Sequence, residues 1–189
     1  MKLQQLPAAL VLCLITASIA PAAVRYVDVN NTNSTPPFLT WATAATNIQD
    51  AVDAAVAGDQ ILVINGVYQS GSRNQSRVEV DKAVTVQSVN GPQVTAIEGT
   101  FGTRCVFLGN GASLAGFTLT NGNLKFLYGS FGGGVAFKDS PSDAVVSNCV
   151  IVNCGAVVGG GAAAATWFGG PPEVNGGMLI NCTFARNQA

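Results

Sequence analysis

The sequence contains no histidine and few charged residues, and both shortages limit what the chain can do. Only 10% of its 189 residues are charged, and the formal net charge is −1. No run of basic residues occurs, so the sequence predicts no nucleic-acid partner. Histidine is the commonest metal ligand and general base. Because it is absent, and because the cysteines lack zinc-site spacing, the sequence predicts no metal site.

Long apolar runs are also scarce, and the one near the start is typical of a secretory signal. Lys2 supplies the positive charge, and residues 8–19 are apolar but too short to cross a bilayer as a helix. Ala20-Pro21-Ala22 offers small residues for cleavage before Ala23. A membrane anchor is the alternative, which the length and the small residues disfavour. We therefore expect a signal peptide at 1–22 and an exported protein, secreted or on the cell surface, with no transmembrane segment after cleavage.

What the sequence does contain is a pattern that occurs three times in its last third, at 116–122, 148–154 and 181–187. The equivalent residues Phe117, Cys149 and Cys182 follow one another at intervals of roughly 33 residues, and a fixed period of this length, carrying strands and no helix, predicts stacked β-coils. A composition of 48% hydrophobic residues indicates a packed core rather than disorder.

Within each copy, apolar residues alternate with residues that point the other way. The expected inward residues are Phe117 and Leu119, Cys149 and Ile151, and Cys182 and Phe184, and the outward ones are Thr118, Val150 and Thr183. One such strand cannot bury its apolar face alone, so the copies must stack as a parallel ladder, roughly 4.8 Å apart. Left-handed corners are expected after the strands, at Asn121-Gly122, Asn153 and Asn187. The same stacking places Asn148 over Asn181.

One helix is predicted, between Thr46 and Gly58. Thr46 and Gln49 fit a capping box with Thr46 as the N-cap, and Gly58 ends the helix. The expected inner face is Ile48, Ala51, Val52, Ala55 and Val56, and the expected outer face is Gln49, Asp50 and Asp53. The first coil of a solenoid has an open apolar end, so we interpret this helix as an N-terminal cap.

The remaining strands are predicted from short apolar or alternating stretches at 61–64, 78–80, 84–87, 94–98, 104–108 and 113–120. Because 61–64 is apolar throughout, we expect it to be buried on both faces. Three strands of about five residues need fewer residues than a coil of ~33 contains. The remaining residues are therefore expected in loops at 123–131 and 166–173. The resulting organisation is a signal peptide at 1–22, a strand and capping helix at 23–58, and coils at 59–189.

The segment from Trp41 to Tyr68 contains Ile48-Gln49-Asp50-Ala51-Val52 and Ile61-Leu62-Val63, and it resembles the cap and first strand of secreted β-helix proteins. From about Tyr26 onward the chain resembles the right-handed parallel β-helix of the pectate-lyase-like superfamily. The glycine triplets and Phe184-Ala185-Arg186-Asn187 are similar to the GGA and FxxN repeats of polymorphic outer-membrane proteins and related adhesins, although Val135 replaces the alanine of the first triplet. The resemblance implies an all-β, right-handed parallel β-helix with an N-terminal capping α-helix.

That superfamily contains polysaccharide lyases, galacturonan hydrolases and pectin esterases, whose chemistry needs converging carboxylates. Beyond residue 64 the acidic residues are Glu79, Asp81, Glu98, Asp139, Asp143 and Glu173. No two of them fall in a repeated strand one coil apart, and the Gly-His-Gly motif of the hydrolases requires a histidine. We therefore assign no catalytic residue and expect no cofactor.

Two loops carry the candidate binding residues, which are Phe126, Tyr128, Phe131, Trp167 and Phe168. Exposed rings of this kind offer a stacking surface for sugars. The alternative is that they cover the apolar flank of a coil.

Four cysteines remain once the signal is removed: Cys105, Cys149, Cys154 and Cys182. An even number in an exported protein favours disulfides. Cys149 and Cys182, however, occupy inward positions of equivalent strands, where a thiol serves as a small apolar side chain. Free buried thiols and disulfides both remain open.

The sequence favours an exported or cell-surface module that binds an extracellular polysaccharide or a surface protein, as an adhesin does. The alternative is the N-terminal part of a polysaccharide lyase or glycoside hydrolase whose active site lies on later coils, and a structural spacer is a third hypothesis. No capping segment follows the last predicted strand, so we expect further coils or another chain to cover an open C-terminal end.

Overall fold

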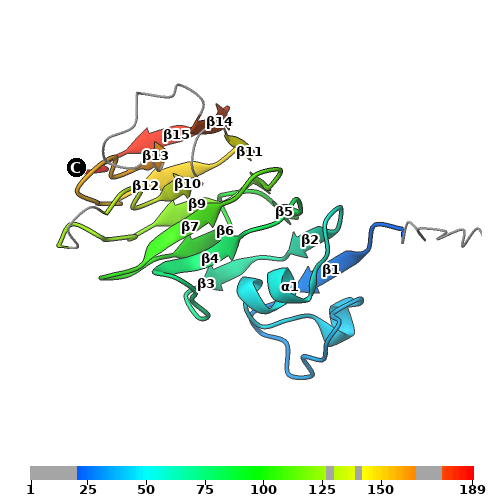
Figure 1. Cartoon of the computed structure of the whole chain (residues 1–189). Coiled ribbons are helices and arrows are strands. Elements are labelled where there is room, and N and C mark those ends of the chain that lie inside the picture. Colours follow the sequence, from blue (N-terminus) through cyan, green and yellow to red (C-terminus); the bar gives the residue numbers. More distant parts are fainter. Residues whose placement is uncertain (1–20, 127–129, 139–141, 165–175) are drawn as a thin grey trace, which may run out of the picture.

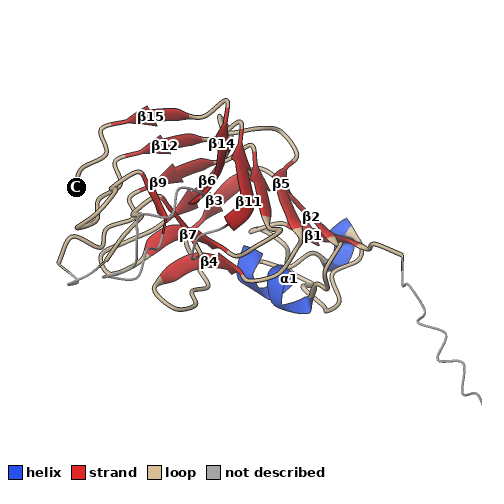
Figure 2. Cartoon of the chain, turned by 45° about the horizontal axis from the view of Figure 1, so that its top comes forward, coloured by secondary structure: helices blue, strands red, loops and turns tan. Residues whose placement is uncertain are grey.

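The computed structural model describes residues 21–126, 130–138, 142–164 and 176–189. In this part of the chain the strands wind into a parallel β-solenoid with three sheets along its sides (Figure 1, Figure 2). All the pairings between neighbouring strands of these sheets are parallel. The predicted all-β parallel β-helix is confirmed.

Each sheet collects one strand from each successive coil. Sheet A is ordered β1 (Val24–Val27), β2 (Gln60–Val63), β5 (Thr85–Ser88), β8 (Ser113–Ala115), β11 (Ser142–Ser147) and β14 (Gly176–Ile180). Sheet B is ordered β3 (Gly66–Tyr68), β6 (Thr95–Glu98), β9 (Thr118–Thr120), β12 (Val150–Val152) and β15 (Thr183–Ala185). Sheet C is ordered β4 (Ser76–Val80), β7 (Arg104–Leu108), β10 (Val135–Phe137) and β13 (Ala162–Ala164).

The repeated pattern stacks in register in sheet B. Ile151 is paired with Leu119 on one side and with Phe184 on the other. Leu119 and Ile151 are fully buried, as the alternation predicts, whereas Phe184 on the last strand is 45% exposed. The period of two therefore decides which side chains enter the core.

The length of a coil is not constant, which the repeat alone does not show. In sheet A the paired residues Ile61 and Val86 are closer together along the chain than the paired residues Val146 and Leu179. The predicted period of ~33 residues thus holds only for the later coils, because the early coils have shorter connections between strands.

The expectation of a strand buried on both faces at 61–64 is wrong. Ile61 and Val63 are fully buried, but Leu62 and Ile64 between and after them are only half-buried. This strand alternates like the others, because its outer face lies on the outside of the solenoid rather than between two layers.

A corner divides the stretch 113–120, which was predicted to be one strand. Gly116 has a φ of 79° and separates β8 from β9. Asn148 and Asn181 occupy the same corner one and two coils later, with φ of 51° and 50°. The predicted asparagine ladder is confirmed, since Nδ2 of Asn181 donates to Oδ1 of Asn148 at 2.6 Å.

The corners that follow β9, β12 and β15 are left-handed, with φ of 59° at Asn121, 56° at Asn153 and 53° at Arg186. The prediction of Asn187 as the third corner residue is therefore wrong by one position. The Asn187 amide instead pairs with the coil before it. Its Nδ2 donates to the Ile151 carbonyl at 2.8 Å, and its Oδ1 accepts from the Cys154 N–H at 2.9 Å. The asparagine of the FxxN-like ending thus joins two coils.

The glycine triplets lie where the backbones of neighbouring coils approach each other closely. A Cβ on Gly133 would come within 2.5 Å of the Gly155 carbonyl oxygen and 2.7 Å of the Gly160 oxygen. The Gly134 N–H donates to the Gly160 carbonyl at 3.0 Å, which connects the two triplets. Glycine is required here by the space available between coils.

The predicted helix exists as α1 (Ile48–Ala54), after a short 3-10 helix η1 (Trp41–Thr43). Its N-cap is Asn47 rather than Thr46, because the Asn47 side chain accepts from the Asp50 N–H at 2.9 Å. Val56 was expected on the inner face, but it lies beyond the end of the helix and is 58% exposed. Among the described residues, no helix has the length and apolar character that crossing a membrane would need.

Gln49 was expected on the outer face of the helix, but its side chain is buried against β4. Its Oε1 accepts from the Glu79 N–H at 2.8 Å, and its Nε2 donates to the Glu79 carbonyl at 3.2 Å. These are the two bonds that a neighbouring strand would make with Glu79. The amide of Gln49 therefore replaces a strand at the edge of sheet C, which begins at β4.

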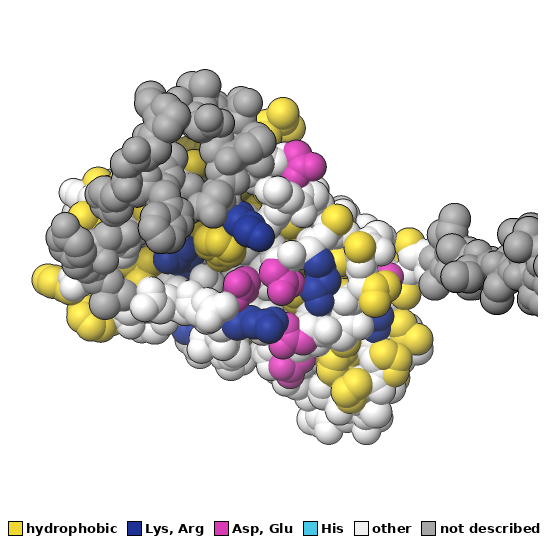
Figure 3. Space-filling model, in the orientation of Figure 1, with side chains coloured by type: hydrophobic (Ala, Val, Ile, Leu, Met, Phe, Trp, Pro, Cys, Tyr) yellow, Lys and Arg dark blue, Asp and Glu magenta, His cyan; other side chains and the backbone are white. Residues whose placement is uncertain are grey.

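Ion pairs also connect α1 to the coils on the outside. Arg73 Nη1 lies 2.8 Å from Asp53 Oδ1 on the helix, and Arg73 Nε lies 3.8 Å from Glu79 Oε2 on β4. Figure 3 shows charged side chains of both signs gathered on this face, over the coils near α1. Opposite charges pair here, so the cluster has a structural explanation.

Candidate functional site

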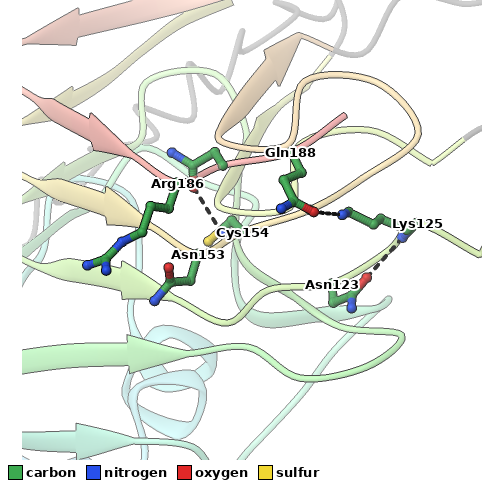
Figure 4. Close-up of a pocket in the computed structure, with 8 residues that line it drawn as sticks. Asn123, Lys125, Asn153, Cys154, Arg186 and Gln188 are labelled. Carbon is green, nitrogen blue, oxygen red and sulfur yellow. Dashed lines mark hydrogen bonds between the residues drawn. The ribbon is translucent and has the colours of Figure 1, made fainter.

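A pocket of about 510 Å³ lies beside the corners that follow β9, β12 and β15 (Figure 4). Its lining residues come from three successive coils and are Asn123, Lys125, Asn153, Cys154, Gly155, Arg186, Asn187 and Gln188. Binding sites for small molecules commonly have volumes of about 300–1,000 Å³. The stacking of coils thus brings residues far apart in sequence to one place.

The lining is basic and rich in amides. Arg186 and Asn153 lie at one end of the pocket, and Lys125 lies at the other with Gln188, whose Oε1 accepts from its ammonium (Figure 4). Asn123 fixes the local backbone, because its Oδ1 accepts from the Lys125 N–H at 3.2 Å. No acidic residue is among the lining residues of the described chain. This arrangement suits a ligand that carries carboxylates and hydroxyls.

An exposed aromatic pair adjoins the pocket. Phe101 is 69% exposed and Phe126 is 75% exposed, and their ring centroids are 5.5 Å apart. Phe101 lies in the turn between β6 and β7 and forms a parallel bridge with Asn123, which also lines the pocket. Lys125 precedes Phe126 directly. Lys125 therefore lies beside the aromatic pair, and Arg186 lies at the other end of the same pocket; these four residues (Phe101, Phe126, Lys125 and Arg186) are called here the aromatic–basic surface.

The five predicted binding residues have different positions. Phe126 is exposed, as a stacking residue requires. Phe131 is half-buried, and the Arg104 guanidinium lies 4.9 Å from its ring centroid. Burial lowers the pKa of Arg104 below its usual range, although the Glu79 carboxylate opposes the shift. Phe131 thus contacts a buried cation. Tyr128, Trp167 and Phe168 lie outside the described residues.

Sequence reasoning missed Phe101, Lys125 and Arg186. Phe101 lies between the predicted strands 94–98 and 104–108, and a lone aromatic residue in a polar turn was the available signal. Lys125 and Arg186 are far apart in the chain and line the same pocket only because their coils stack. The acidic residues form no such group. Within the described residues, no three His, Cys, Asp or Glu side chains converge in a way that could hold a metal ion.

The four cysteines within the described residues are free thiols. Cys105 and Cys154 have their sulfur atoms 4.0 Å apart in the core. Burial raises the pKa of Cys105 well above its ordinary value, and burial likewise raises the pKa of Cys149 to about 11. Cys182, the corresponding residue one coil after Cys149, is only half-buried.

The burial difference predicts the thiol reactivity of the native protein. At neutral pH we expect a maleimide to modify Cys182 readily, while Cys105 and Cys149 react only after denaturation. Both of these thiols are buried, and burial raises the pKa of both, so each is hard to reach and stays protonated, and a protonated thiol is a poor nucleophile. Mass spectrometry of digested, labelled protein identifies the modified residues. Rapid labelling of Cys149 in the folded state would contradict the prediction, and a Cys182→Ser variant provides the unlabelled control.

Comparisons with known proteins give little beyond the fold. No protein-family model matches the sequence, and no curated protein matches it. A solved structure described as rhamnogalacturonan lyase is similar, with 16% identity and a TM-score of 0.44. The similarity covers 86% of this chain and 51% of that chain, so this chain spans about half of its length. The similarity assigns no activity to this chain.

Proposed function

We propose that this chain is an exported β-helix module that binds an acidic extracellular glycan at the aromatic–basic surface. The observation that carries the proposal is a pocket that both Lys125 and Arg186 line, with amides and no carboxylate among its described lining residues, next to the exposed Phe101–Phe126 pair. Aromatic rings take the apolar faces of sugars, amides bond to hydroxyls, and two cations recognise carboxylates. A surface protein with an acidic segment is the other partner with matching chemistry.

The two ends of the solenoid have different proposed roles. Helix α1 acts as an N-terminal cap, because it packs against β1, β2 and β4 and because the Gln49 side chain bonds to the Glu79 N–H and carbonyl at the edge of β4. The coils wind right-handed, as parallel crossovers nearly always do. At the other end β14 and β15 expose apolar side chains, namely Met178, Leu179, Ile180 and Phe184. Further coils or another chain cover this apolar surface.

Removal of the two charges should weaken glycan binding at least tenfold. The test compares the wild type with a Lys125→Gln/Arg186→Gln double variant, which keeps side chains of similar length and loses only the cations. Calorimetric titration with a uronic-acid oligosaccharide and with a neutral oligosaccharide of equal length measures the effect. Each lost charge-assisted hydrogen bond is worth about 1.5–3 kcal/mol, so a tenfold change is a lower limit.

Lys138→Gln is the matched control, because Lys138 is exposed and is not a lining residue of the pocket. It should bind like the wild type, and Phe126→Ala should weaken both oligosaccharides if the ring stacks on sugar. Equal binding by the wild type and the double variant would reject the pocket as the binding site. Release of shortened sugars with new unsaturated or reducing ends would favour the enzyme alternative.

A further inference from the structure

The expected cleavage point lies directly beside a buried carboxylate. Pro21 and Ala22 are exposed, whereas Ala23 is half-buried and has its N–H and its carbonyl both bonded within the fold. The Ala23 nitrogen lies 2.8 Å from Oδ1 of Asp59, and the Ala23 carbonyl accepts from the Gln60 N–H at 2.9 Å. The pairing of β1 with β2 then begins at the next residue, Val24.

Asp59 is the centre of a network at the start of the solenoid. It is 1% exposed. Its Oδ2 accepts from Nη2 of Arg25 at 3.0 Å, from Nε of Arg25 at 3.2 Å and from the Val56 N–H at 3.0 Å. Arg25 has a further acceptor, the Pro37 carbonyl, at 2.7 Å. One carboxylate oxygen thus faces the guanidinium, and the other accepts from the Ala23 nitrogen.

We propose that cleavage between Ala22 and Ala23 completes this network, with the new α-ammonium group of Ala23 forming an ion pair with Asp59. The proposal rests on the proposed export of the chain. Hydrolysis breaks the Ala22–Ala23 peptide bond; the oxygen of one water becomes the second oxygen of the Ala22 carboxylate, and the two protons of that water convert the Ala23 nitrogen into an ammonium group. The nitrogen that donates as an amide in the precursor becomes a cation at the same place. Its hydrogen bond to Asp59 becomes charge-assisted and therefore stronger.

The consequence is that processing stabilises the first coil. β1 is the first strand of sheet A, and it also contacts α1, which packs against β2 and β4. An ion pair at the start of β1 holds the strand against β2. The residue that follows the cleavage point therefore contributes to the stability of the fold. A chain with a residue left before Ala23 is predicted to be less stable than the processed chain.

The experiment uses the full chain exported from cells, and N-terminal sequencing of the product should begin at Ala23. A second version carries one glycine inserted between Ala22 and Ala23. It keeps the Ala20-Pro21-Ala22 signal and every side chain, but it moves the ammonium one residue away from Asp59. We expect this version to melt about 2–4 °C lower, since a single partly exposed ion pair has an effect of this size in a chain of this length.

A double-mutant cycle isolates the pair. In an Asp59→Asn background the glycine insertion should have no effect on the melting temperature. Equal melting of the processed and inserted proteins would overturn the ion pair, and so would an insertion effect of the same size in the Asp59→Asn background. If Asp59→Asn does not fold, the comparison of the processed protein with the glycine-inserted protein still tests the ion pair. An exported protein that begins elsewhere would overturn this inference alone, whereas a chain that is not exported would also overturn the proposed function.

Discussion

Replacing Ile151 with aspartate is expected to lower the melting temperature by about 6–20 °C or to unfold the coils completely. Ile151 is fully buried between Leu119 and Phe184 in sheet B. An uncompensated buried charge costs about 3–5 kcal/mol, which is a large fraction of a typical stability of about 5–15 kcal/mol. At about 2–4 °C per kcal/mol for a chain of this length, the shift is large. Thermal unfolding followed by circular dichroism measures it.

Thr183→Asp is the matched control, because Thr183 lies on the neighbouring strand β15 and is exposed. It should melt within about 1–2 °C of the wild type, as surface substitutions usually do. A cooperative transition for Ile151→Asp at the wild-type temperature would show that Ile151 does not face the core, and the stacking of the three copies would then be wrong.

Gln49→Leu is expected to lower the melting temperature by about 5–15 °C. Leucine keeps the volume of the side chain and suits a helix, but it makes no hydrogen bond to Glu79. The Glu79 N–H and carbonyl then lose the partners that they have at 2.8 Å and 3.2 Å. Each polar group left unsatisfied costs about 1–3 kcal/mol, and two are affected.

Hydrogen exchange distinguishes this mechanism from a general loss of packing. The Glu79 amide should exchange much faster in Gln49→Leu, whereas the Val106 amide, which bonds to the Gly134 carbonyl at 3.0 Å, should remain protected. Gln93→Leu changes an exposed glutamine and should leave both amides unchanged. Unaltered protection of Glu79 would mean that Gln49 does not close the edge of sheet C.

The contrast between Ile151 and Gln49 shows which buried positions a sequence pattern can predict. The inward position of Ile151 follows from a period of two and from a copy of the same pattern one coil later, at Phe184. The burial of Gln49 breaks the helical pattern, because a polar residue lies on the buried side of α1. A pattern of apolar residues cannot predict a buried amide, since its hydrogen-bond partners belong to a strand distant in the sequence.

The candidate site depends even more on tertiary structure. Among its principal residues only Phe126 was predicted, because an aromatic residue in a loop is visible in the sequence. The pairing of Phe126 with Phe101 and the presence of Lys125 and Arg186 in one pocket depend on loop lengths in successive coils. Because the coils differ in length, a fixed repeat does not specify which loop residues become neighbours in space.

The sequence by itself determined the parallel stacking, the inward side of the repeated strands and the asparagine corners. These properties come from local alternation and from residues that tolerate positive φ, and both are readable along a single stretch of chain. Only the tertiary structure decided the role of Gln49, the contact between Ala23 and Asp59 and the aromatic–basic surface. Each of these joins residues that are distant in the sequence, and the physical cause is the winding of coils, which converts separation along the chain into proximity in space.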